Sequence, residues 1–276
     1  MTPATTVLAL LDHVETAHPV LAAAGLLAGR LLGARIDVLH IRPKIDPTFM
    51  PTEEVMTEPR AREFTRREDM QSADLKEVFD AWQRDAGGQL KATWREGIGT
   101  EKAVMSAEAG KGGLVVIGHQ AQSHGGRVRD AIQASLFDAE AAVVLVPPMV
   151  PLTMGLHPAV AWKPSEAANR AVQAALPLLL AAERVTVLVA DEDGSGDAMS
   201  PALQDVQRTL DSRFELRRVD PRGRRTSMAL LEEAQAVGAD LLVMGAYTRR
   251  RLIEFVLGGV TRDVLADVSL PVLMHH

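Results

Sequence analysis

The chain contains the same unit twice, and this repeat limits the folds open to it more than any other feature. Residues 100–118 read TEKAVMSAEAGKGGLVVIG, and residues 227–245 read SMALLEEAQAVGADLLVMG. Each segment has a helical pattern, a glycine that marks its end, a short apolar run and a final glycine. The final glycines, Gly118 and Gly245, are 127 residues apart (245 − 118). The sequence therefore predicts a duplicated domain.

The segments that close the two halves support the duplication. Val144-Leu145 and Val272-Leu273 are 128 residues apart (272 − 144), which indicates that the register slips by one residue across the intervening helix. Between the halves, residues 147–155 contain three prolines, which disfavour helix and central strand alike. We therefore predict two domains, at residues 1–148 and 155–276.

Both halves alternate apolar runs with helical patterns, which implies parallel strands, right-handed crossovers and a doubly wound sheet. The third apolar run of each half alternates polar and apolar residues, as an edge strand does. Caps predict helices starting at Ser200-Pro201 and at Thr226 or Ser227, the second ending at Gly238. We predict an α/β fold with five strands per half, at 7–11, 36–41, 90–94, 114–117 and 142–146, and at 159–162, 185–190, 214–219, 241–244 and 271–274.

Composition argues against several classes of function. The formal net charge of −6 gives no global attraction to nucleic acid or to anionic lipid. Without cysteine the chain has no disulfide, no thiolate nucleophile and no cysteine-ligated zinc, which suits a reducing cytosol. The first residues have neither the basic flank of a signal peptide nor the length of a membrane span. We expect a cytoplasmic protein with no nucleic-acid or membrane partner.

The last part of the chain has a pattern that suits phosphate binding. The apolar run 241–244 predicts a strand buried on both faces, and Gly245 after it allows a ligand to approach the backbone. Thirteen positions further on (258 − 245), residues 258–261 read Gly-Gly-Val-Thr and place free N–H groups and a hydroxyl at a predicted helix start. Helix N-termini bind anions because they carry unpaired donors and partial positive charge.

These residues resemble the universal stress protein family, whose signature is glycine, two residues, glycine, nine residues, glycine, then a small residue or serine/threonine. Here Gly245, Thr248 and Gly258-Gly259 keep the spacing, with Thr248 in place of the second glycine. The resemblance implies a Rossmann-like domain of the adenine nucleotide alpha hydrolase type in each half. One branch of the family binds ATP with this motif, and another lacks the motif and binds no nucleotide. Thr248 leaves both alternatives open, because a β-branched residue disfavours a left-handed turn.

Ligands of doubly wound sheets lie beyond the carboxyl ends of the strands. In the second half this gathers the ends of its first, second and fourth strands with the start of its last helix. The resemblance implies an aspartate after the first strand, where this chain has a lysine that can instead meet phosphate as a point charge. We therefore predict a site for ATP, AMP or another phosphorylated small molecule in the C-terminal domain, formed by Lys163, Ser165, Ala190, Gly245, Thr248, Gly258, Gly259, Val260 and Thr261.

The first half departs from this pattern. Counting back 128 residues places Asp130 opposite Gly258, so a carboxylate stands where phosphate would need donors. We expect no nucleotide there. Histidines follow several predicted strand ends near Asp12, but none has the short spacing of a zinc site, and we predict no metal.

Residues 43–59 have no counterpart in the second half and are either a lid or an insertion. The basic loops at 217–225 and 249–251 are typical of solvated surfaces. Residues 124–127 are typical of a small anion nest, which is an alternative to a metal site.

The sequence favours a binding protein over an enzyme. It has no nucleophile elbow, no P-loop and no glycine-rich pyrophosphatase loop after the first strand. We therefore expect a tandem universal stress protein that binds a nucleotide or a related ligand in a stress response. Two alternatives stay open, a scaffold that acts through protein partners without nucleotide, and a weak ATP hydrolase. Family protomers pair through their last strands, so the resemblance implies an internal pseudo-dimer in which 142–146 faces 270–274, with or without a further dimer of chains.

Overall fold

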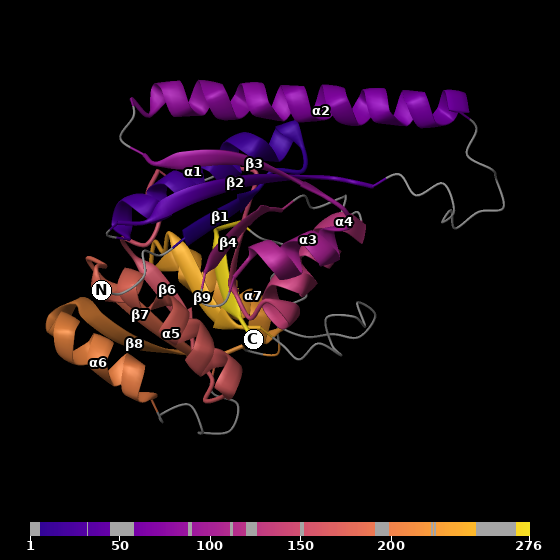
Figure 1. Ribbon diagram of the computed structural model, residues 1–276. Helices are drawn as coiled ribbons and strands as arrows, with labels where there is room; N and C mark the ends of the chain where they lie inside the picture. The colour runs from indigo at the N-terminus through magenta and orange to yellow at the C-terminus, as the bar shows by residue number, and fades with distance from the viewer. Residues whose placement is uncertain are drawn as a thin grey trace.

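The computed structural model describes residues 6–31, 33–44, 58–87, 90–110, 113–119, 126–149, 152–190, 199–221, 223, 225–246 and 269–276. Within these residues the chain forms a ten-stranded sheet with helices on both faces (Figure 1). The sheet is parallel within each half, and the predicted α/β fold with two five-stranded Rossmann-like halves is confirmed.

The first half supplies one side of the sheet and the longest helix. Its strands are β1 (Thr6–Leu10), β2 (Arg35–Arg42), β3 (Ala92–Ile98), β4 (Leu114–Gly118) and β5 (Ala142–Val146). Its helices are α1 (Val14–Arg30), α2 (Glu58–Asp85), α3 (Glu101–Glu108) and α4 (Gly126–Gln133), and α4 continues into a π-helical turn, η1 (Ala134–Asp138). Figure 1 shows α2 running along the edge of the molecule beside β3.

The second half repeats this order of strands and helices. Its strands are β6 (Pro158–Ala161), β7 (Val185–Ala190), β8 (Phe214–Val219), β9 (Leu241–Gly245) and β10 (Val272–His275). Its described helices are α5 (Glu166–Leu180), α6 (Pro201–Leu210) and α7 (Thr226–Ala236), with a short 3₁₀ turn, η3 (Asp211–Arg213), before β8. Helix α6 is capped by the hydroxyl of Ser200, as predicted, and α7 ends before Gly238, which has a positive φ of 69°.

The strand order is β3-β2-β1-β4-β5-β10-β9-β6-β7-β8, so the third strand of each half lies at an edge, as the sequence predicts. The extent of the first edge strand was predicted wrongly as 90–94. Strand β3 pairs with β2 from Ala92 to Ile98 instead. Its side chains are anchored from outside the strand, because Ser72 of α2 donates a hydrogen bond to the Glu96 carboxylate (2.8 Å). A contact so distant in sequence is not visible in a local pattern.

The last strands of the two halves pair with each other in antiparallel fashion and join the halves into one sheet. In these two strands, corresponding residues of the two halves are 129 positions apart in the sequence, and not 128 as the sequence suggests. His119 N–H donates to the Val146 carbonyl (2.8 Å), and Ala246 N–H donates to the His275 carbonyl (2.7 Å), so Val146 corresponds to His275 (275 − 146 = 129). The same offset makes Val144 the counterpart of Leu273 (273 − 144 = 129), and these two residues face each other across the β5–β10 ladder. An approximate twofold axis therefore passes between them.

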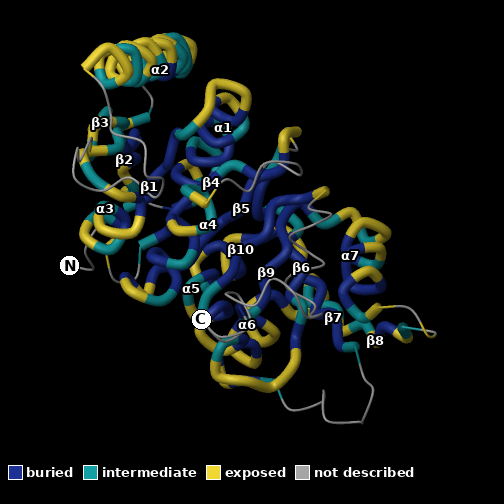
Figure 2. The backbone as a smooth tube through the Cα atoms, turned by 90° about the vertical axis from the view of Figure 1, so that its right-hand side faces the viewer, coloured by how far each residue is buried: buried dark blue, intermediate teal, exposed yellow. Residues whose placement is uncertain are grey.

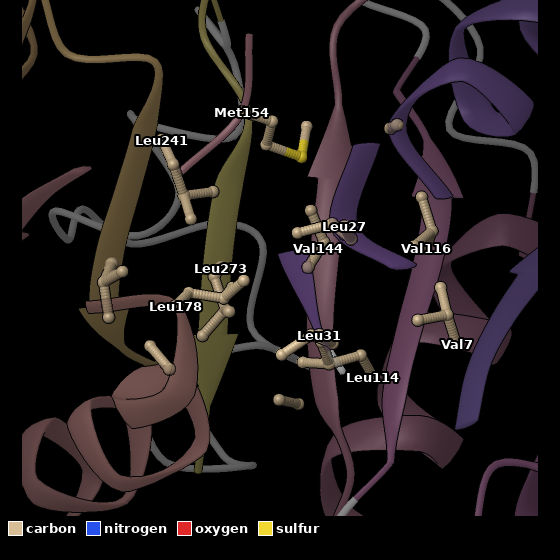
Figure 3. Close-up of a cluster of buried hydrophobic side chains, with 14 of the residues drawn as sticks. Val7, Leu27, Leu31, Leu114, Val116, Val144, Met154, Leu178, Leu241 and Leu273 are labelled. Atoms are coloured by element: carbon tan, nitrogen blue, oxygen red, sulfur yellow. The ribbon is translucent and has the colours of Figure 1, made fainter. Parts of the chain in front are cut away.

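The hydrophobic core is continuous across this axis on both faces of the sheet. On the face covered by α1 and α5, Val144 and Leu273 lie among buried side chains from both halves, including Leu27 and Leu178 (Figure 3). On the opposite face a second cluster joins residues near α3, α4 and α7. Figure 2 shows the strands buried between helices whose outer faces are exposed. No helix that the structure describes has both the length and the hydrophobicity needed to cross a membrane.

The segment that leads from the first half into β6 is held by one buried carboxylate. The side chain of Asp240, which precedes β9 and is 5% exposed, accepts hydrogen bonds from the backbone N–H groups of Gly155 (3.0 Å), Leu156 (2.9 Å) and His157 (3.0 Å). A carboxylate that accepts several backbone N–H groups satisfies donors that burial would otherwise leave unpaired. Asp240 therefore fixes where the second half begins, next to the strand that forms its centre.

The free energy of unfolding is expected to fall in acid because of His275, which lies in the strand that joins the two halves. Burial lowers the pKa of His275, at the end of β10, below the ordinary 6.5; Arg170 and His276 act in the same direction, while the His276 backbone and Glu140 oppose them. The folded chain then binds this proton less tightly than the unfolded chain, so stability is complete above pH 6.5 and falls as the pH drops through the lowered pKa.

Urea unfolding at about pH 7.5 and about pH 5.5 tests this dependence. We expect the loss of stability on acidification to be smaller in His275→Gln than in the parent. The exposed His18 provides a matched control, and His18→Gln should lose as much stability as the parent. An equal loss in His275→Gln and the parent would contradict the assignment to His275.

Candidate functional site

The described candidate residues of the C-terminal half lie at one edge of the sheet. Strand β6 lies between β7 and β9, with Ala161 paired to Leu188 on one side and to Met244 on the other. Because the three strands are parallel, their carboxyl ends meet at the same edge, and Lys163, Ala190 and Gly245 follow or end them. The structure thus brings together three strand ends that the sequence assigns to one site.

Lys163 supplies a cation at this edge. It is exposed, and among the described residues no hydrogen bond or ion pair engages its ammonium group. An unpaired, solvated ammonium can approach an anionic ligand without first breaking an internal ion pair.

Ser165 has a structural task at the same place. It is the N-cap of α5, where its hydroxyl oxygen accepts a hydrogen bond from Ala168 N–H (3.1 Å). A serine hydroxyl that accepts one bond still has its own proton to donate, so the cap leaves a donor available to a ligand. The cap also fixes the first turn of α5 beside the strand ends.

Gly245 is constrained by packing. A Cβ atom on Gly245 would lie 2.6 Å from the backbone nitrogen of Ala168 and 2.8 Å from the carbonyl carbon of Ala167, both in the first turn of α5. Its repeat counterpart Gly118 is crowded in the same way by Thr16 of α1, whose Cβ would lie 2.6 Å away. Close approach of a helix to the end of a buried strand therefore accounts for glycine at both positions.

The rest of the predicted site lies outside the described residues. This applies to Thr248, Gly258, Gly259, Val260 and Thr261, to the arginines at 249–251, and to His124. The proposed lid at 43–59 falls outside as well, except that residues 43 and 44 are described and α2 begins at Glu58.

Sequence comparison relates the second half of the chain to a known family. Residues 159–276, nearly the whole of the second half from β6 onward, match the sequence model of the universal stress protein family. The C-terminal half of the chain is therefore similar in sequence to this family. No curated protein matches the sequence at a significant level.

Solved structures extend the likeness to the whole chain. A universal stress protein from Archaeoglobus fulgidus superposes with a TM-score of 0.69 at 16% identity, covering 98% of this chain and 95% of its own. A functionally unknown protein from Pseudomonas aeruginosa gives 0.59 at 12% identity, with 99% and 92% covered. The cytoplasmic domain of a prokaryotic cation chloride cotransporter gives 0.52 at 9% identity, with 99% and 95% covered. At these identities the likeness shows the fold, and it shows it for both halves.

The N-terminal half carries the opposite charge at the corresponding strand end. Leu11 N–H donates to the Leu39 carbonyl, and Trp162 N–H donates to the Leu188 carbonyl, both at 2.9 Å, so Leu11 corresponds to Trp162 (162 − 11 = 151). The next residue in each half is then Asp12 in the first and Lys163 in the second (163 − 12 = 151). The family resemblance implies an aspartate at this position, and Asp12 of the first half matches it whereas Lys163 of the second half does not.

Arg127, in the first turn of α4, reaches the end of β1 and neutralises this carboxylate. Its guanidinium lies 3.4 Å from Asp12, donates a hydrogen bond to Glu101, and donates another to the Ile41 carbonyl at 2.8 Å. An arginine side chain held by two carboxylates is not available to bind an anion. The anion nest at 124–127 depends on backbone N–H groups and stays a prediction, since residues 124 and 125 lie outside the described residues.

One further expectation for the first half is corrected. Helix α4 begins at Gly126, so Asp130 lies within the helix and is exposed, and is not at a helix start. Gly258 lies outside the described residues, so its correspondence with Asp130 stays a prediction. The carboxylates that occupy this strand end are those of Asp12 and Glu101, which the sequence pattern did not single out for this role.

The described histidines near these strand ends do not gather into a metal site. His40 is fully buried, and its Nδ1 lies 2.9 Å from the Leu11 carbonyl, an acceptor, which assigns the proton to Nδ1. Its ring stacks on Trp94 with centroids 6.2 Å apart. His13 instead contacts the Asp12 carboxylate at 3.2 Å. Among the described residues no group of three or more histidine and carboxylate side chains is arranged to hold a metal ion.

The basic loop of the second half is partly neutralised by acidic neighbours. Arg217 of β8 pairs with Glu215 (2.6 Å) and with Glu233 of α7 (2.7 Å), and these hydrogen bonds raise the pKa of its guanidinium. Both partners lie on the same edge of the molecule as the arginine. This arrangement fits the solvated surface that the sequence favours.

Proposed function

We propose that this chain is a cytoplasmic stress-response binding protein whose C-terminal half binds an adenine nucleotide, ATP or AMP, or a related phosphorylated small molecule. The observation that supports the proposal most is the exposed cation of Lys163 beside the capped N-terminus of α5, at an edge where the ends of β6, β7 and β9 meet. A lysine and a helix N-terminus both favour a negatively charged ligand. The family match of residues 159–276 is consistent with a ligand at this edge.

Calorimetric titration of nucleotide-free protein with ATP, AMP and cyclic AMP tests the proposal. We expect binding heat for at least one of the three ligands, with a stoichiometry of one per chain. Absence of binding at millimolar ligand would reject a nucleotide ligand and favour the alternative of a scaffold that acts through protein partners.

Lys163→Gln should weaken binding of the nucleotide by about tenfold, because a single charge-assisted contact to phosphate contributes on the order of 1–2 kcal/mol. Lys91→Gln is the matched control, since Lys91 is also exposed but precedes β3 in the other half. The affinity should be unchanged in the control. Equal affinities of both variants and the parent would remove Lys163 from the site.

We further propose that the protein binds its ligand without turning it over. The proposal is supported by the motif pattern, which lacks the elements of known nucleotide hydrolases. Phosphate release from ATP with added magnesium, measured on the same preparation, is expected not to exceed a protein-free blank. Release above the blank that scales with protein concentration would favour the weak hydrolase instead.

A further inference from the structure

We propose that Arg127 closes the strand-end site of the N-terminal half from within the chain, as an intramolecular occupant that keeps a phosphorylated ligand out of this half. The proposal concerns the half for which no nucleotide is expected, and it stands whether or not the C-terminal half binds one.

The first step is geometric. The Arg127 guanidinium bridges three elements, because Asp12 follows β1, Ile41 belongs to β2 and Glu101 is the first residue of α3. With its own helix, α4, it therefore ties together four segments at the carboxyl ends of the strands. In a doubly wound sheet this is the place where a ligand would otherwise bind.

The second step is electrostatic. The Asp12 and Glu101 side chains are 13% and 12% exposed, so both carboxylates are largely removed from water. Burial acts to lower the pKa of Arg127, but the charge of Asp12 and the hydrogen bond and charge of Glu101 outweigh it and raise the pKa. Two desolvated carboxylates need a cation, and without one they repel each other and any phosphate. The arginine thus meets a requirement that the site itself creates.

The third step is the attachment of α2, which the second half does not reproduce at this length. Gln71 of α2 donates a hydrogen bond to the Asp12 carbonyl, and Glu68 adds its negative charge to the surroundings of Arg127. Between these two residues, Asp69 pairs with Arg42 at the end of β2. Helix α2 therefore covers the same strand ends that Arg127 closes, and its 28 residues compare with 10 in the corresponding helix α6.

The two halves are therefore specialised by opposite charges at corresponding positions. In the first half Asp12 is paired with an internal arginine. In the second half the corresponding Lys163 is exposed and available. A chain with a closed strand end in one half and an exposed lysine at the corresponding place in the other is expected to take up one phosphorylated ligand, not two.

Chemical rescue of Arg127→Met tests this inference without any nucleotide. Removing the cation from two buried carboxylates should lower the Tm by roughly 4–8 °C, and Arg127→Lys, which keeps the charge, should lower it less. Arg62→Met is the matched control, because Arg62 forms an exposed pair with Glu58 and its loss should shift the Tm by less than about 1 °C. The smaller effect of the lysine variant also provides a folded protein if the methionine variant does not fold.

Methylguanidinium chloride supplies the missing group from solution. At about 50 mM it should raise the Tm of Arg127→Met by roughly 2 °C relative to equal sodium chloride, and it should not raise the Tm of the parent or of Arg62→Met. The inference is overturned if Arg127→Met is as stable as Arg62→Met, or if methylguanidinium acts equally on all three proteins. Two nucleotides bound per parent chain would also overturn it, whereas no nucleotide bound would count against the proposed function alone.

Discussion

Replacing Asp240 by alanine is expected to lower the free energy of unfolding by about 3 kcal/mol. The substitution leaves the N–H groups of Gly155, Leu156 and His157 without the carboxylate that accepts them. Hydrogen bonds to a charged group contribute about 1.5–3 kcal/mol each, but the three share one side chain and water will satisfy some of the freed donors. The effect is large because the carboxylate is buried beside the central strand of the second half.

Urea unfolding of the parent, Asp240→Ala and Asp240→Asn checks this expectation. In the asparagine variant an amide oxygen can replace Oδ1, which accepts from Gly155 and His157, while the amide nitrogen meets the N–H of Leu156 and cannot accept it. Asp240→Asn should therefore lie between the parent and Asp240→Ala. Equal stability of all three proteins would show that the carboxylate does not hold the segment before β6.

The fold could be predicted because its signals are local and occur twice. Gly118 and Gly245 each end an apolar run, and helix stops precede both runs, so the duplication and the strand alternation can be read from short windows. The closing strands show the limit of this reasoning. Both contain a Val-Leu pair, which suggested an offset of 128, yet the backbone pairing gives 129. Side-chain similarity cannot fix a register when neighbouring apolar residues are interchangeable, and a one-residue error reverses the face of each side chain.

The interactions that distinguish the two halves were not predictable from local patterns. Asp240 bonds to residues 83 to 85 positions earlier, and Arg127 reaches Asp12 from the other end of the first half. The available hint was chemical, because a carboxylate directly before a buried strand must find donors. That argument requires a partner for Asp240 but does not name one. By contrast Lys163, Ala190 and Gly245 could be placed together, since the topology of a parallel sheet alone brings their strand ends to one edge.

Gly245→Ala is expected to destabilise the protein by about 3 kcal/mol in the absence of any ligand. The new methyl group would lie 2.6 Å from the Ala168 backbone nitrogen, and a helix backbone cannot move aside as a side chain can. Relief requires the first turn of α5 to shift away from β9, which would disturb the Ser165 cap and the packing beneath it. In Gly118→Ala the new methyl group would lie 2.6 Å from Thr16 Cβ, which is bonded directly to the backbone of α1, so a destabilisation of similar size is expected.

Gly29→Ala provides the control for the methyl group itself. Gly29 lies in α1, and a Cβ there meets nothing within 4 Å, so alanine should leave stability unchanged or raise it by up to about 1 kcal/mol. Thermal and urea unfolding of the three variants should show Gly29→Ala to be more stable than both Gly118→Ala and Gly245→Ala. If Gly245→Ala instead keeps the parent's stability and loses only nucleotide binding, then the ligand, and not helix packing, is what requires glycine at the end of β9.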